Sequence, residues 1–228
     1  RRWLDWLVEE KVTRTKFPIE KFWAAKLVKD AHTKGVARSF DNINFMQGKE
    51  SLYKKGYKDQ FLNSVRMQYG ESVKLLIGMC QERVRSITDD FKTQALEAVR
   101  KIIIQGGSDE EIKDAISEVA ASIIKSKVER DMGDVIITSH AEGQLDGFEH
   151  LGVEQVGVRA EWVTAGDDRV CELCKYHEGN VYRIDEARGL IPLHPRCRCC
   201  WFAVRVAKND KFRKVVSVAA KLAKTKKS

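Results

Sequence analysis

The feature that most constrains the fold of this 228-residue chain is a cysteine- and histidine-rich stretch at residues 160–201. It holds five of the six cysteines and two of the five histidines, whereas the rest of the chain reads as charged helices. Cys171 and Cys174 form a C-x-x-C pair, and His194 and Cys197 form an H-x-x-C pair. Two such pairs joined by a loop suit a tetrahedral Zn²⁺ site, because each pair reaches the ion from one tight turn. The spacing therefore predicts a metal site.

The ligands that we expect are Cys171, Cys174, His194 and Cys197. Cys199 or His177 could replace His194 in this set. Thiolates in three of four positions leave the ion no open coordination site, so we expect structural zinc, contributing on the order of 10 kcal/mol to folding. Two disulfides are the alternative, but nothing in the sequence indicates export, and reducing compartments keep such thiols free.

The same region carries a longer signature. Trp162 is followed by a D-x-R-x-C-x-x-C run that starts at Asp167, by a Gly179-Asn-Val181 step, and by the segment Pro192-Leu-His-Pro-Arg-Cys-Arg-Cys199. This order resembles the C-terminal signature of the phage head-morphogenesis family, the Mu F-like minor head proteins. Ile191 stands where the family usually has a second proline, and Thr138–Glu142 matches the family's Arg-Thr-Glu triplet only loosely. The resemblance covers about residues 85–203.

This resemblance implies a minor capsid or head-morphogenesis protein of a tailed phage or prophage. Such proteins associate with portal or capsid proteins in the host cytoplasm during assembly. They are then carried in several copies in the virion, inside the head beside the DNA. The expected role is structural, without enzymatic activity.

Helical periodicity dominates the first two thirds of the chain. Residues 16–38 read as a helix that ends at Gly35, and residues 39–48 have the composition of a linker. Between Tyr57 and Ile104 the apolar positions recur every three or four residues without a proline, which fits one long helical arm or two helices end to end, with a restart near Ser86.

Two further helices follow that arm. Ser108 and Glu111 form a predicted capping box ahead of a helix at 109–123, and another helix is expected at about 127–150. Three antiparallel helices with short connections would make a small bundle. Gln155–Thr164 and Trp201–Val206 alternate like strands on either side of the cysteine region.

The predicted fold class is thus α+β, mainly α. A small antiparallel sheet is expected to carry the zinc site at one end, with Trp162 and Trp201 packed beside it. The expected domains are an N-terminal helical segment (1–48), the long helix and bundle (49–152), the β module (153–206) and a basic tail (207–228).

The tail concentrates the charge of the chain. From Arg205 onward it has nine Lys/Arg and one Asp, which leaves +8, equal to the net charge of the whole chain. Such a tail attracts phosphates through counterion release without reading sequence, so we expect it to bind double-stranded DNA. The expected DNA-binding residues are Lys211, Arg213, Lys214, Lys221, Lys224, Lys226 and Lys227.

No run of eighteen apolar residues exists, and Trp3–Val8 is too short for a signal-peptide core, so no membrane partner is expected. The chain begins with Arg1 rather than Met, which suggests a fragment or a processed product.

One catalytic alternative remains. His140-Ala-Glu142 followed by the Cys171–Cys174 pair is similar to the H-x-E and C-x-x-C elements of zinc nucleobase deaminases, in which the Glu moves protons to and from a zinc-bound water. Val170 stands where those enzymes have a proline, and the second pair of ligands would have no role. A structural site should depend little on Glu142, whereas a deaminase would lose activity when that residue is changed.

Overall fold

The computed structural model describes residues 22–46, 57–152 and 157–205. It is mainly helical with a small antiparallel sheet near the C-terminus, which confirms the predicted α+β, mainly α class. The contacts divide the chain into two compact units, one of residues 1–26 and 74–135, the other of residues 27–73 and 136–228.

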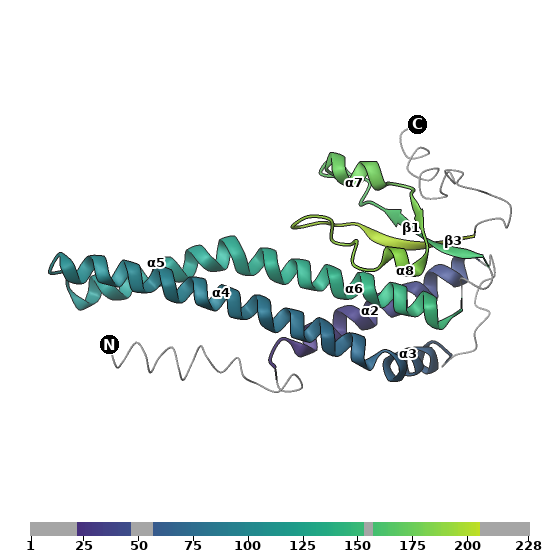
Figure 1. Cartoon of the computed structure of the whole chain (residues 1–228), viewed down its shortest axis with the longest axis horizontal. Coiled ribbons are helices and arrows are strands. Elements are labelled where there is room, and N and C mark those ends of the chain that lie inside the picture. The colour runs from purple at the N-terminus through teal and green to yellow at the C-terminus, as the bar shows by residue number, and fades with distance from the viewer. Residues whose placement is uncertain (1–21, 47–56, 153–156, 206–228) are drawn as a thin grey trace. The chain divides into compact units, whose positions relative to one another are not determined.

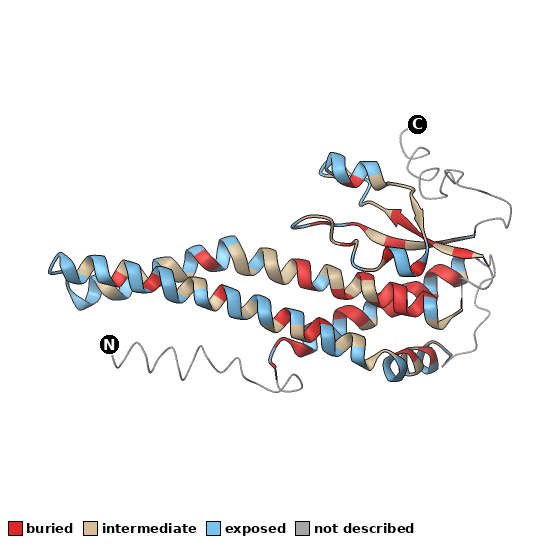
Figure 2. Ribbon diagram, viewed as in Figure 1, coloured by how far each residue is buried: buried red, intermediate tan, exposed pale blue. Residues whose placement is uncertain are grey.

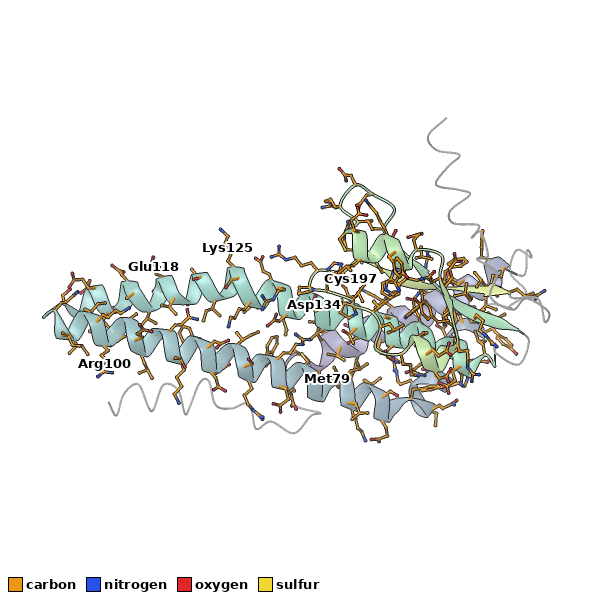
Figure 3. All side chains as sticks on the ribbon, turned by 45° about the horizontal axis from the view of Figure 1, so that its top comes forward. Met79, Arg100, Glu118, Lys125, Asp134 and Cys197 are labelled. Carbon is orange, nitrogen blue, oxygen red and sulfur yellow. The ribbon has the colours of Figure 1, made fainter. Side chains whose placement is uncertain are left out.

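The first unit contains a helical hairpin. Helix α4 (Gly70–Ile104) turns back through Gly106 and Gly107 into α5 (Asp109–Ile123), and the two helices run side by side (Figure 1). The predicted capping box is confirmed, since Ser108 Oγ accepts from the Glu111 amide at 3.3 Å. An ion pair between Lys127, just after α5, and Asp90 of α4 joins the two arms of this helical hairpin. Figure 3 shows Glu118 and Lys125 pointing away from α4.

The sequence predicted a break between a helix at 109–123 and another at about 127–150, and the structure has no such break. A π-helical turn, η3 (Ile124–Val128), joins α5 directly to α6 (Glu129–His150). No glycine or proline lies between Ser108 and Gly133, so no helix-breaking residue ends the helix in this segment. The predicted array of three separate antiparallel helices is therefore wrong at this point.

Two other predicted helix ends are also wrong. Helix α2 (Ala25–Met46) continues through Gly35 and through the segment expected to be a linker. The break in the Tyr57–Ile104 stretch falls at Tyr69, between α3 (Tyr57–Gln68) and α4, rather than near Ser86.

Gly35 lies where α2 crosses α6 in the second unit. A Cβ on Gly35 would lie 2.0 Å from the His140 carbonyl oxygen, and one on Gly143 would lie 2.2 Å from the His32 carbonyl oxygen. Both contacts are far shorter than real Cβ contacts, so glycine is required for the two backbones to approach. Here the glycine serves close packing rather than helix termination.

Polar contacts and a small apolar cluster hold α2, α3 and α6 together. His32 Nε2 lies 2.9 Å from Asp146 Oδ2, and both side chains are buried. Ser64 Oγ lies 2.6 Å from His150 Nε2. The apolar cluster contains Val36, Phe40, Phe61 and Val65.

The sheet has three antiparallel strands, β1 (Val158–Val163), β2 (Val181–Tyr182) and β3 (Cys200–Arg205), in the order β2-β1-β3. Trp162 pairs with Trp201 across β1 and β3, as expected for two aromatic residues packed together. Buried residues gather in α2, the C-terminal half of α6 and the sheet (Figure 2).

Gln144 on α6 attaches this helix to β3. Its Nε2 donates to the Trp201 carbonyl at 2.7 Å, and its Oε1 accepts from the Trp201 amide at 3.1 Å. Within the described ranges, no helix is both long enough and apolar enough to cross a bilayer.

Candidate metal centre

The first ligand pair lies at the start of a short helix. Cys171 is the N-cap of α7 (Glu172–His177), and its Sγ accepts from the Cys174 amide at 3.4 Å. One helical turn therefore presents both sulfurs on the same side, with Cys171 exposed and Cys174 buried.

The second pair lies in a tight turn. The Cys197 amide donates to the His194 carbonyl at 3.1 Å, with Pro195 and Arg196 at the two central positions. Arg196 has a φ of 60°, a left-handed conformation that closes the turn at some cost for a residue with a Cβ. His194 and Cys197 consequently point to one side, as the spacing predicted.

The donor atoms of the two pairs meet. His194 Nε2 lies 3.2 Å from Cys171 Sγ and 3.0 Å from Cys174 Sγ, and Cys174 Sγ lies 3.9 Å from Cys197 Sγ. In a tetrahedral zinc site, with Zn–S of about 2.3 Å and Zn–N of about 2.0 Å, neighbouring donors are about 3.5–3.8 Å apart. The donors are thus close enough to bind a metal ion.

Cys199 joins the cluster as a fifth donor. Two groups have all their donor atoms within 4.8 Å of one another: Cys171, Cys174 and His194 form one, and Cys174, Cys197 and Cys199 form the other. Cys174 belongs to both groups and lies at the centre of the cluster. All six cysteines lie in the described ranges, and none forms a disulfide.

Hydrogen bonds and burial shift the protonation of the donors in both directions. His194 Nδ1 donates to the Pro195 carbonyl at 2.8 Å, which leaves Nε2 without a proton on the side of the sulfurs. Hydrogen bonding with the Cys199 thiol lowers the pKa of Cys197 to about 5. The backbone amide of Cys174 lowers the pKa of Cys171, whereas burial raises the pKa of Cys174 to about 12. A metal ion favours the thiolate form of such groups, so the cluster suits a cation.

An ion pair fixes the loops that carry the ligands. Both guanidinium nitrogens of Arg198, between Cys197 and Cys199, donate to the Asp167 carboxylate at 2.6 Å. The pKa of Asp167 is consequently held well below its usual range. The two ligand pairs are therefore joined by Asp167, the first Asp of the D-x-R-x-C-x-x-C run, and by Arg198 of the C-R-C segment.

An aromatic wall covers the cluster on the side of the sheet. Trp162 and Trp201 are almost fully buried and meet edge to face, with ring centroids 5.4 Å apart. His177 packs on Trp162, and its Nδ1 lies 2.7 Å from the Tyr182 hydroxyl. His177 belongs to neither donor group of the described residues, so among the alternatives to His194 only Cys199 is within reach.

The β module is also bound to α6 by an arginine that sequence reasoning missed. Arg188 follows α8 (Ile184–Ala187), and its guanidinium forms ion pairs with Glu142, Asp146 and Glu149 of α6. The spacing of these acids, four and three residues apart, puts them on one helix face and was the available signal.

The residues of the deaminase pattern lie elsewhere. His140 on α6 is partly buried, which lowers its pKa, and it belongs to neither donor group of the described residues. Glu142 accepts from Arg188 at 3.0 Å and from the Gly189 amide at 2.9 Å. Both oxygens of Glu142 thus have structural partners. That a structural metal site depends little on this residue stays a prediction.

The expected DNA-binding residues, from Lys211 to Lys227, lie outside the described residues. No family model, curated protein or solved structure matches this chain, so the family resemblance remains a prediction from the motif residues.

Proposed function

We propose that residues 157–205 form a zinc-stapled structural module of a phage head-morphogenesis protein. The observation that carries the proposal is the convergence of Cys171, Cys174, Cys197 and His194 from two tight turns. This donor set, with three sulfurs and one nitrogen, is typical of closed structural zinc sites.

The surroundings of the donors support a structural role over catalysis. A catalytic zinc needs a coordination position for water or substrate, whereas here Cys197, a fourth donor, lies 3.9 Å from Cys174 of the group with Cys171 and His194. Glu142, the acid–base group of the alternative deaminase, makes structural hydrogen bonds to Arg188 and Gly189. The proposal therefore assigns no enzymatic activity to the chain.

The zinc content and ligand type of the purified protein test this proposal directly. We expect one zinc per chain and an X-ray absorption spectrum dominated by sulfur. Protein that binds no zinc from a solution with free zinc contradicts the metal site. A spectrum with two sulfurs, one nitrogen and one oxygen favours the deaminase alternative.

The phage role is supported by the motif. Asp167 and Arg198, which belong to the family signature, hold the two ligand pairs together, and Trp162 of the same signature is buried on β1. The signature residues thus have structural tasks within the module. By this proposal the chain is a virion component of the phage head, bound to portal or capsid proteins.

The proposed contact with double-stranded DNA is carried by the basic tail. Deleting residues 208–228 removes eight Lys/Arg and one Asp. We expect the affinity for duplex DNA to fall and its dependence on salt concentration to become shallower, because fewer counterions are released. The zinc content should stay at one. An unchanged salt dependence would contradict DNA binding by the tail.

A further inference from the structure

Five donors lie around Cys174, one more than a tetrahedral ion takes, and they fall into two groups of three. Cys174 is common to both groups of close donors. One group adds Cys171 and His194, and the other adds Cys197 and Cys199. A single ion bound by Cys171, Cys174, Cys197 and His194 leaves Cys199 as the extra thiol.

Cys199 faces the same space as the histidine. A small hollow at the cluster is lined by Cys171, Cys174, His194 and Cys199 together with neighbouring residues of the two loops. Cys199 is 7% exposed and directly precedes β3, so the sheet fixes its position. The Cys199 thiol and the His194 imidazole therefore line the same hollow.

His194 is less buried than three of the four thiols in the cluster. It is only partly buried and lies in a turn whose next two residues, Pro195 and the left-handed Arg196, are exposed. Cys174, Cys197 and Cys199 are all buried. A rotation of the His194 side chain that withdraws the imidazole would leave the three buried sulfurs in place.

We propose that Cys199 is a reserve ligand, which takes the place of His194 on the metal and converts a site of three sulfurs and one nitrogen into a site of four sulfurs. The inference rests on the proposed metal staple. In the exchange the neutral imidazole leaves through Nε2, the Cys199 thiol gives its proton to water, and its sulfur forms the new bond. No electrons are transferred.

Four variants test the exchange by zinc content and X-ray absorption. His194→Ala keeps one zinc per chain, with four sulfurs around it. Cys199→Ser keeps one zinc with three sulfurs and one nitrogen. The double variant binds zinc at least tenfold more weakly than either single variant. Cys200→Ser is the matched control, because Cys200 lies beside Cys199 but in neither donor group, and it leaves the spectrum unchanged.

The result that overturns the proposal is a His194→Ala protein that loses its zinc to the same extent as the double variant. Retention of zinc with three sulfurs and an oxygen also overturns it, because Cys199 would then have stayed off the metal. A His194→Ala chain that fails to fold counts against it as well, since four sulfurs should hold the module. These results leave the metal staple intact, whereas wild-type protein without zinc contradicts the staple itself.

Discussion

At the scale of single residues, Arg188 forms three ion pairs that bind the β module to α6. Asp146 is completely buried, and its two carboxylate oxygens accept from Arg188 at 2.8 Å and face His32 at 2.9 Å. A buried carboxylate that loses a cationic partner keeps its desolvation cost without the compensating attraction. Removing Arg188 should therefore lower the free energy of unfolding more than removing one partner of an ordinary surface ion pair.

We predict that Arg188→Met lowers the free energy of unfolding by about 2 kcal/mol, less than for a fully buried pair because the side chain is 32% exposed. Urea denaturation followed by tryptophan fluorescence measures the change. Lys58→Met is the control, since Lys58 pairs with a half-exposed Asp41 in the same unit, and it should cost below about 0.5 kcal/mol. Equal losses in the two variants would contradict the special role of Arg188.

Tyr69 gives the molecule a predictable response to alkaline pH. Burial, followed by the charges of Glu149 and Asp146, raises the pKa of Tyr69 to about 12, against about 10 in an unfolded chain. The folded protein therefore holds this proton more tightly, so the stabilisation is complete below about pH 10 and is lost as the pH rises toward about 12.

We predict that wild-type protein loses stability between these pH values and that Tyr69→Phe loses less. Urea midpoints measured across this range, together with tyrosinate absorbance, provide the test. Tyr176→Phe, at a tyrosine that is 80% exposed, should leave the wild-type pH dependence in place. The prediction is wrong if Tyr69→Phe and Tyr176→Phe show the same slope of stability against pH.

Short-range chemistry decided which residues of the site could be predicted from sequence. The C-x-x-C and H-x-x-C pairs are local motifs, and their spacing was enough to predict a Cys/His cluster here, in which Cys174 is shared by a group with Cys171 and His194 and a group with Cys197 and Cys199. Arg188 and its acids are about forty residues apart in the chain, so only the tertiary fold reveals their pairing. Whether zinc is the metal bound remains a prediction.

At the scale of the helices, the crossing of α2 and α6 depends on glycines that local rules would treat as weak points. We predict that Gly143→Ala destabilises the protein by about 2 kcal/mol, because the new Cβ would meet the His32 carbonyl oxygen at 2.2 Å. Gly133→Ala, on the same helix, meets nothing within 4 Å and should stabilise by about 0.8 kcal/mol through helix propensity.

Thermal denaturation of the two variants measures this difference, and the sign is the decisive result. A Gly143→Ala variant at least as stable as wild type would mean that the helices do not approach as closely as the structure has it. The variant Gly35→Ala, whose Cβ would meet the His140 carbonyl oxygen at 2.0 Å, provides an independent second measurement.

The same helices show why element boundaries were harder to predict than element types. Periodicity correctly indicated helices at 57–104 and 109–123, and the capping box fixed the start of α5. A glycine such as Gly35 looks the same in the sequence whether it ends a helix or lets two helices pack closely. Only the contact with α6 distinguishes the two cases, and that contact involves residues a hundred positions away.

At the scale of the whole molecule, the division into two units predicts an uneven response to metal removal. Both donor groups lie in the second unit, and the described residues of the first unit contain no such group. We predict that a zinc chelator abolishes the near-ultraviolet circular dichroism of Trp162 and Trp201 but leaves most of the α4–α5 helical signal.

Hydrogen exchange with and without the chelator measures the response of each unit. Amides of β1 and β3 should exchange faster without metal, while those of α5 should keep their protection. The Cys174→Ser protein is the control, because it should respond little to the chelator. An equal loss of amide protection in both units would contradict the predicted uneven response to metal removal.

Gln144 has a further consequence for the sheet. The Trp162 amide and carbonyl bond to Asn180 and Gly179 on the β2 side, so the Trp201 groups point outward from β3, where the Gln144 amide satisfies them. An outer strand with free backbone groups is a template on which other chains can aggregate. The glutamine occupies this position as an additional strand would, so at Trp201 the edge of the sheet is closed to a further strand by α6.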